Sequence, residues 1–354
     1  MLAGSDRALR EGCAAPDPKG SVSVEYRQLG TSGLVVSRVS YGNSTTAGNQ
    51  LDDSRSAECV HAALDAGITT FDTADGYSAG RAEEALGKAL KAERRDSLVI
   101  TSKVFFPTGK GPNDRGLSRK HIRSAVEGSL RRLGTDYLDV YVAHRYDARV
   151  PLTETMSAFA DLVRAGKVLY LGVSDWEPEQ VVRAKGLADG LGVQLICSQA
   201  QYSMLWRIPE AGLAQTCEAL GLGQFAWSPL AGGVLTGKYL PGAAAPEDSR
   251  VAEAQGAMEA MNRWYRMGPE VLARVQELKA VAADAGLSMS QLALSWVLHH
   301  RNQDSVVIGA SRPAQIAANL AVLERALDSE VLARIDDVLG PVVVRDPALD
   351  PQPS

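Results

Sequence analysis

Short apolar runs rich in β-branched residues recur along this chain, and segments of helical period lie between them. Their starts are about 30 residues apart except before the last, which is the length of one parallel β-α unit. Eight units in succession favour a closed (β/α)8 TIM barrel of the α/β class over an open doubly wound sheet. The expected strands are 35–42, 69–75, 98–104, 138–144, 169–175, 194–201, 224–230 and 305–311.

Two additions to the barrel are expected. The turn residues Gly30-Thr31-Ser32-Gly33 predict an N-terminal β-hairpin that covers its closed end. The interval between the seventh and eighth strands is longer than one crossover needs, so extra helices are expected there, over the barrel mouth. A capping box, Ser288-Met289-Ser290-Gln291, predicts the start of one of these helices.

The two ends of the chain differ from its middle. Residues 1–23 lack apolar periodicity and predict a disordered N-terminal extension. Residues 341–354 are predicted to be an irregular, loose tail, because prolines end helices and interrupt central strands. Residues 24–340 then form a single barrel domain, a size that such barrels commonly reach.

Charge and cysteine content restrict the partners and the compartment. The 37 basic and 42 acidic residues give a net charge of -5, which predicts neither a nucleic-acid nor a membrane partner. The four cysteines are scattered and form no C-x-x-C, which favours a reducing cytoplasm. The chain shows neither an 18-residue apolar stretch nor a signal-peptide pattern, so we expect a soluble protein that is not exported.

Polar residues gather late in the predicted strands, where the active sites of such barrels lie. The second to fourth strands end near Asp72, Tyr77, Lys103 and His144. The later strands end near a second set: Ser174, Gln199, Trp227, Ser228 and Ser311. We therefore expect one site at the barrel mouth, built from seven consecutive strands.

Four of these residues suit the chemistry of a carbonyl group. A lysine that ends an apolar strand needs a counter-charge, and Asp72 on the adjacent strand is the expected partner of Lys103. The ammonium would stabilise the phenolate of Tyr77 and bring its pKa into a useful range for proton transfer. His144 could then orient a bound carbonyl. Taken singly, each residue could serve only the fold; their shared position indicates a site.

Ordered motifs relate the chain to a known family. From Glu25 to about Leu339 it resembles the aldo-keto reductases, and most closely the branch that contains potassium-channel β subunits and their bacterial relatives. The motifs are GITTFDTADGY at 67–77, ITSK at 100–103, GLSRKHI at 116–122, GVSDW at 172–176, WSPL at 227–230 and IGAS at 308–311.

The resemblance implies an NADPH-dependent reductase that converts an aldehyde or ketone to an alcohol. Tyr77 would donate the proton, Lys103 and Asp72 would adjust the pKa of its phenol, and His144 would orient the substrate. The absence of a G-x-G-x-x-G after any strand agrees with cofactor binding outside a Rossmann domain. Channel β subunits have an asparagine in the place of His144, so the histidine favours a working enzyme.

The resemblance also implies which residues bind the cofactor. Those near the nicotinamide would be Asn43, Ser44, Gln50, Asp72, Ser174, Asp175, Gln199 and Trp227. Those near the pyrophosphate and the adenosine would be Ser228, Pro229, Leu230, Ala231, Gly232, Lys238, Arg250, Gly309, Ser311, Arg312, Gln315 and Asn319. Three departures bear on the preference for NADPH over NADH and on details of binding: Asp175 replaces Asn, Gln315 replaces Arg, and Ala318 replaces an acidic residue of many relatives.

The substrate pocket is expected to be lined by Tyr41, Thr45, Phe105, Tyr146, Met204, Leu205 and Trp206. The natural substrate cannot be named from the sequence. The resemblance leaves both a monomer and a homo-oligomer open.

Three other functions were weighed. Residues 232–238 match the P-loop pattern G-x-x-x-x-G-K, but Tyr239 replaces the required Ser or Thr, and Pro241 prevents the helix that must follow. The five histidines show no H-E-x-x-H, so no metal site is predicted. A regulatory or scaffold subunit that binds NADPH and turns over little remains the alternative to the reductase.

Overall fold

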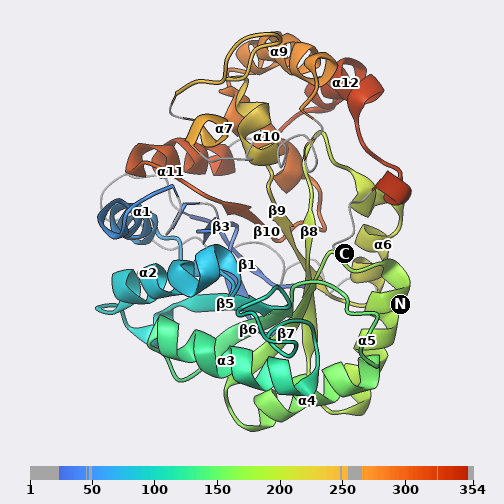
Figure 1. Cartoon of the computed structure of the whole chain (residues 1–354). Helices are drawn as coiled ribbons and strands as arrows, with labels where there is room; N and C mark the ends of the chain where they lie inside the picture. Colours follow the sequence, from blue (N-terminus) through green and yellow to red (C-terminus); the bar gives the residue numbers. More distant parts are fainter. Residues whose placement is uncertain are drawn as a thin grey trace.

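The computed structural model describes residues 24–44, 46–47, 50–247, 249–253, 265, 267–324 and 326–349. Eight parallel strands close into a barrel in the order β10-β3-β4-β5-β6-β7-β8-β9, which confirms the predicted TIM barrel (Figure 1). The strands are β3 (Val39–Gly42), β4 (Thr70–Asp72), β5 (Val99–Val104), β6 (Leu138–Ala143), β7 (Val168–Ser174), β8 (Leu195–Gln201), β9 (Gly223–Trp227) and β10 (Ser305–Ile308).

The first predicted strand, 35–42, divides between two elements. Its beginning, β2 (Val35–Ser37), pairs antiparallel with β1 (Tyr26–Gln28) to form the predicted hairpin, and only β3 enters the barrel. Leu29 and Val36 of the hairpin are fully buried beside Phe225, so the hairpin covers the closed end of the barrel. Gly30 has φ +56°, and a Cβ there would lie 2.4 Å from the carbonyl oxygen of Gly221, so this turn requires glycine.

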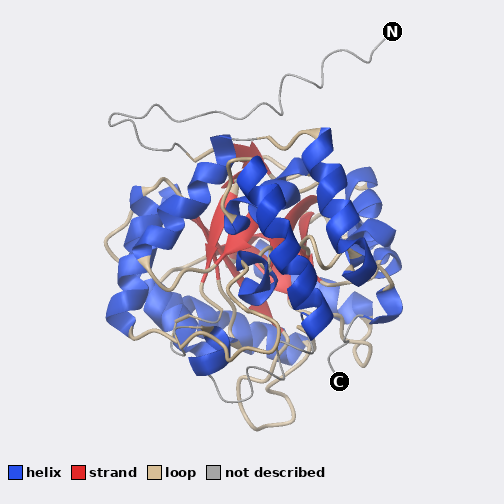
Figure 2. Cartoon of the chain, turned by 90° about the horizontal axis from the view of Figure 1, so that it is seen from above, coloured by secondary structure: helices blue, strands red, loops and turns tan. Residues whose placement is uncertain are grey.

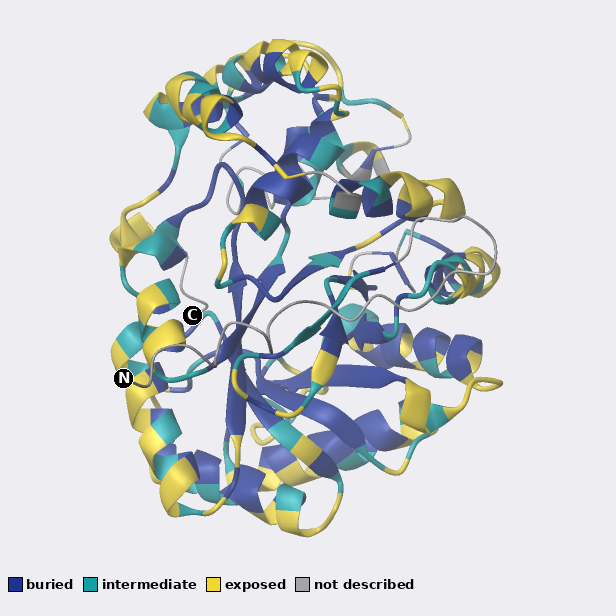
Figure 3. Ribbon diagram, turned by 180° about the vertical axis from the view of Figure 1, so that it is seen from behind, coloured by how far each residue is buried: buried dark blue, intermediate teal, exposed yellow. Residues whose placement is uncertain are grey.

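Helices surround the barrel on all sides, with the strands at the centre (Figure 2). Their buried residues face the strands and their exposed residues face outward (Figure 3). Asp52 and Ser118 cap two of them through their side chains, and the predicted capping box at Ser288 and Gln291 is present. The helices are α1 (Asp53–Asp65), α2 (Arg81–Leu90), α3 (Arg119–Leu133), α4 (Leu152–Arg164), α5 (Pro178–Gly190), α6 (Leu213–Ala219), α7 (Arg250–Glu253), α9 (Pro269–Asp284), α10 (Met289–His299), α11 (Pro313–Leu320) and α12 (Ser329–Leu339).

The predicted extra helices lie between β9 and β10. They include α7 and α9 in addition to α10. α9 packs against α12 at the top of the view in Figure 1. Short 3-10 helices join several strands to the next helix, among them Tyr77–Gly80 after β4 and Ala231–Thr236 after β9. These two turns follow strand ends at the mouth of the barrel.

The chain ends were expected to be loose. Residues 1–23 and 350–354 lie outside the described residues. Between them and the barrel, the C-terminal segment is anchored rather than loose: Val344 forms a β-bridge with Trp206, donates its backbone N–H to Leu205 and accepts from Arg207. Two prolines of this segment lie in short 3-10 helices, Gly340–Val342 and Pro347–Leu349, and the backbone between these helices pairs with a loop.

One helical pair satisfies the length and composition of a membrane span. Among the described residues no single helix is long and apolar enough, but α9 and α10, which are bent by 84° at their junction, pass the test together. Both helices have residues buried within the molecule, as core helices do.

Candidate active site

Asp72, Lys103 and Tyr77 form one chain of contacts at the barrel mouth. Asp72 ends β4 and Lys103 lies near the end of β5, so parallel pairing brings the two strand ends together. The Nζ of Lys103 donates to Asp72 Oδ2 at 2.7 Å, to the carbonyl oxygen of Thr73 at 2.8 Å and to the hydroxyl of Tyr77 at 3.1 Å. The fully buried ammonium is therefore paired, as a charge at this depth must be.

Asp72 is held on its other side as well. Its Oδ1 accepts from Thr101 Oγ1 at 2.7 Å and from Gln199 Nε2 at 2.9 Å. With Lys103 on Oδ2, both carboxylate oxygens are hydrogen-bonded. This arrangement fixes the ammonium, and through it the phenol, without the help of a ligand.

The backbone after β4 aims Tyr77 at this pair. Tyr77 begins the 3-10 helix Tyr77–Gly80, in which Ser78 and Ala79 have φ of +51° and +55°. Two successive non-glycine residues in this left-handed region store strain, which is typical of functional sites. The turn places the phenol ring with its centroid 4.8 Å from Lys103 Nζ.

The acidity of Tyr77 differs from the sequence-based expectation. Burial raises the pKa of its hydroxyl above the ordinary value, and the charge of Lys103 offsets only part of this shift. The phenol is therefore protonated at neutral pH. Lys103 lowers the pKa of this phenol, as expected, but the loss of solvent around the phenolate outweighs the effect of the cation.

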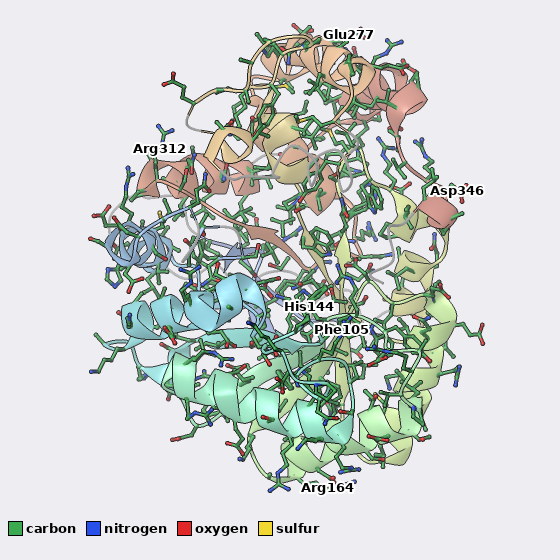
Figure 4. The ribbon with its side chains drawn as sticks, in the orientation of Figure 1. Phe105, His144, Arg164, Glu277, Arg312 and Asp346 are labelled. Atoms are coloured by element: carbon green, nitrogen blue, oxygen red, sulfur yellow. The ribbon has the colours of Figure 1, made fainter. Side chains whose placement is uncertain are left out.

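His144 follows β6 and faces the same phenol. Its ring lies edge-to-face with Tyr77 at 5.5 Å and with Phe106 at 4.9 Å between centroids. Burial, then Lys103 and Arg145, lower the pKa of His144 well below its usual value, so the imidazole is neutral. Figure 4 labels His144 near the centre of the molecule, close to Phe105.

A cavity of about 800 Å³ opens beside these residues. It extends from Tyr77 and His144 to α10 and α11, where Arg312 projects outward (Figure 4). Of the residues predicted to bind a cofactor, the cavity is lined by Ser44, Gln50, Asp72, Ser174, Gln199, Trp227, Ser228, Pro229, Leu230, Gly232, Lys238, Gly309, Ser311, Arg312, Gln315 and Asn319.

Residues 38–339 match the family model described as "Aldo/keto reductase family". The chain belongs to this family. The match covers the whole barrel, including the strand ends that carry Asp72, Lys103 and His144. Membership supports an oxidoreductase activity in general terms.

Curated relatives match this aldo/keto reductase over most of their length. A protein of Oryza sativa subsp. japonica, named "Probable voltage-gated potassium channel subunit beta", is 40% identical over 322 residues, which cover 89% of this chain and 97% of the relative. A protein of the same name from Arabidopsis thaliana has the same identity and coverage.

Four predicted cofactor residues of this aldo/keto reductase are not among those that line the cavity. Asn43 is buried and its Nδ2 donates to the carbonyl oxygen of Ala82 at 2.8 Å. Ala231 is also buried, although its neighbour Gly232 lines the cavity. Asp175 faces Trp227 and Arg145 instead, and the side chain of Arg250 lies outside the described part of the chain.

Of the expected substrate lining, no residue that the structure describes is among those bordering this cavity. Tyr41 and Phe105 are buried in the core, and Tyr146 packs its ring against Trp176. The loop residues Met204, Leu205 and Trp206 are buried too, and the last two border a separate cavity of only about 10 Å³. Thr45 lies outside the described residues.

Two residues that sequence reasoning missed line the cavity beside Tyr77: Phe106 and Arg145. Phe106 lies two residues beyond β5, where the chain has left the strand and its alternation no longer predicts direction. Arg145 follows His144 directly, and an arginine next to a predicted site histidine at a strand end was the signal that the sequence offered.

Asp175 connects two walls of the site. Its Oδ1 accepts from the backbone N–H of Gln201 at 2.9 Å, and its Oδ2 lies 3.0 Å from Arg145 Nη1. The indole N–H of Trp227 reaches both carboxylate oxygens. Both carboxylate oxygens thus have partners within the protein, and Asp175 is not among the residues that line the cavity.

Proposed function

We propose that this aldo/keto reductase reduces an aldehyde or ketone to an alcohol, with NADPH as the hydride donor and Tyr77 as the proton donor. One observation carries the proposal: the phenol of Tyr77, hydrogen-bonded to the buried Lys103–Asp72 pair, lines a cavity large enough for a dinucleotide. A phenol held by a buried cation at such a cavity is suited to deliver a proton to a carbonyl oxygen.

The donor set along the cavity fits a dinucleotide phosphate. In the turn Ala231–Thr236, Gly232 and Gly233 have φ of +65° and +99°, a geometry that turns backbone groups toward the cavity beside Lys238. Lys238 supplies positive charge beside this turn; on the α11 side of the cavity Arg312 supplies positive charge, and Gln315 and Asn319 supply amides. We propose that these residues bind the phosphates and the adenosine, and that Trp227 and Gln199 flank the nicotinamide.

Residues of this chain hold and deliver the proton that the carbonyl oxygen receives. NADPH, when bound, supplies the hydride to the carbonyl carbon. Tyr77, protonated because burial raises its pKa, donates its proton to the oxygen as negative charge develops there. Although burial disfavours its charge, Asp72 and Tyr77 hold the pKa of Lys103 above its usual value, so it remains a cation beside the phenolate that results. Neutral His144 can hydrogen-bond the carbonyl oxygen and orient it.

The assay of purified protein with NADPH and 4-nitrobenzaldehyde tests the proposal. Steady loss of the near-ultraviolet absorbance of NADPH, dependent on the aldehyde, is the expected result. Saturable binding of NADPH with no turnover of any aldehyde or ketone in a broad panel would contradict it.

That second outcome would instead support the regulatory candidate. The relatives' names, "Probable voltage-gated potassium channel subunit beta", support a protein that associates with a channel. His144 supports the enzyme, since the family resemblance implies an asparagine at this position in channel β subunits. Size-exclusion chromatography addresses the oligomeric state, which neither candidate fixes.

The thiols support a reducing compartment. Cys59, Cys197 and Cys217 are free and buried. We propose the cytoplasm as the compartment, where free thiols persist.

A further inference from the structure

Arg145 is a buried arginine that lines the cavity without a role in the proton transfer above. Its side chain is about nine-tenths buried, and it follows His144 at the end of β6. The guanidinium is anchored through one nitrogen: Nη1 donates to the carbonyl oxygen of His144, lies 3.3 Å from Ser174 Oγ and lies 3.0 Å from Asp175 Oδ2.

The opposite edge of this guanidinium is not engaged. None of the described residues accepts a hydrogen bond from Nε or Nη2 of Arg145. Neither nitrogen is among the fully buried polar atoms that lack a partner, so both are accessible from the cavity that Arg145 lines. Nε–H and the adjacent Nη2–H point in parallel and form the fork that binds both oxygens of a carboxylate.

Two aromatic rings flank this fork. The guanidinium carbon lies 5.7 Å from the centroid of Phe106 and 6.0 Å from that of Trp227. Phe106 in turn touches His144, which touches Tyr77, at 4.9 and 5.5 Å between ring centroids. The fork and the phenol therefore lie at one end of the cavity, with aromatic walls that suit a planar group.

Asp175 balances the charge of Arg145 without blocking it. Its carboxylate Oδ2 lies 3.0 Å from Nη1, and the carboxylate also accepts from Trp227 and from the backbone of Gln201. The ion pair fixes the plane of the guanidinium before a ligand arrives, which lowers the entropy lost on binding. A substrate carboxylate would add a second, bidentate partner on the other edge.

We propose that Arg145 determines specificity by binding a carboxylate carried by the carbonyl substrate, so that the preferred substrates are planar aldehydes or ketones with an anionic group. The inference rests on the proposed reductase function. It assigns to Arg145 the recognition of the substrate and leaves the proton transfer to Tyr77.

The test compares 4-carboxybenzaldehyde with its neutral analogue 4-formylbenzamide. We expect the wild type to prefer the carboxylate in kcat/KM, and Arg145→Gln to lower the carboxylate-to-amide ratio about 10- to 100-fold, the range for a charge-assisted hydrogen bond. Arg145→Lys keeps the charge but not the fork and should give an intermediate ratio. The double variant Arg145→Gln/Asp175→Asn controls for an unpaired Asp175 and should lower the ratio as much as Arg145→Gln.

A binding measurement separates this inference from the proposed function. Calorimetric titration of the protein loaded with NADP+ should show tighter binding of terephthalate than of terephthalamide, with the preference lost in Arg145→Gln. If the wild type reduces both aldehydes and the ratio is unchanged in the folded variants, the inference fails and the reductase stands. If neither aldehyde is reduced, the proposed function fails, and equal binding of the two non-aldehyde probes would then overturn the Arg145 assignment as well.

Discussion

The indole Nε1 of Trp227 lies 3.1 and 3.0 Å from the two carboxylate oxygens of Asp175. This contact fixes the orientation of the Trp227 ring, which lines the cavity. The backbone of Asp175 is in the left-handed region, with φ +51°. A carboxylate suits the position because its partners, Trp227, Arg145 and the N–H of Gln201, are all donors. The aspartate therefore acts as a support for Trp227 and Arg145.

Asp175→Asn is expected to weaken the contacts that hold the side chains of Trp227 and Arg145 in place. The amide supplies one acceptor oxygen and turns an NH2 group toward donors, so Arg145 loses its counter-charge and Trp227 part of its hydrogen bond. We expect a loss of about 1–3 kcal/mol in the free energy of unfolding and weaker binding of NADPH, seen as reduced quenching of tryptophan fluorescence on titration. Asp65→Asn, at an exposed carboxylate on α1, is the control. Unchanged stability and affinity in Asp175→Asn would show that the contact is dispensable.

Tyr77→Phe removes only the phenolic oxygen. Lys103 keeps Asp72 and the carbonyl oxygen of Thr73 as partners, so the fold should be retained. We expect aldehyde reduction to fall about 100- to 10,000-fold, as for the loss of a general acid. The dissociation constant for NADPH should change little. Turnover within a few fold of wild type would remove Tyr77 from the mechanism.

The sequence predicted the parts of this site that depend on strand order. β-branched runs gave the barrel, and parallel strand ends must meet at one mouth, which placed Asp72, Lys103 and His144 together. Side-chain direction beyond the strand ends was not predictable. Phe106 rather than Phe105 faces the cavity because the chain turns after Val104, where period-2 alternation stops.

The net pKa of Tyr77 also required the structure. A sequence shows that a cation is available but not how far a phenol is removed from water, and burial proved the larger effect. Similarly, Asp175 stands at the correct strand end, but only the coordinates show that its carboxylate faces Trp227 and Arg145.

The pH profile of reduction follows from two shifted groups. Burial raises the pKa of Tyr77 above its usual value, and burial lowers that of His144 well below its own. The proton donor is thus lost only as the pH rises through the raised phenol pKa, and His144 gains a proton only at acid pH. We expect kcat to be flat from about pH 7 to about pH 9. A falling limb centred below pH 8 would show that another group limits the reaction.

Arg312→Ala tests the preference for NADPH. Arg312, at the start of α11, lines the part of the cavity where we place the 2'-phosphate. Loss of the guanidinium should raise KM for NADPH about 10-fold and leave KM for NADH nearly unchanged, because NADH lacks that phosphate. Initial rates with each cofactor at saturating aldehyde measure the effect. An equal rise in KM for both cofactors would show that Arg312 does not contact the 2'-phosphate.

The buried carboxyl group of Asp75 should make the free energy of unfolding depend on pH, whether or not the protein is an active enzyme. Its side chain is buried, and neither carboxylate oxygen has a hydrogen-bond partner among the described residues. Burial, then the charge of Glu83, raise the pKa of Asp75 to about 8, against the smaller opposing effects of the nearby backbone N–H of Gly76, of Arg132 and of Lys103. Between its unfolded value near 4 and this folded value, the folded state holds a proton that the unfolded chain has released.

Stability should therefore fall as the pH rises toward 8, with a slope of up to about 1.4 kcal/mol per pH unit from this group. Asp75→Asn stays neutral, so its advantage in the free energy of unfolding should be small at pH 5 and reach several kcal/mol at pH 9. Urea unfolding at both values measures it, with exposed Asp65→Asn as the matched control. If the difference between Asp75→Asn and wild type is the same at both pH values, Asp75 is ionised in the folded protein, and an unseen partner must stabilise its charge.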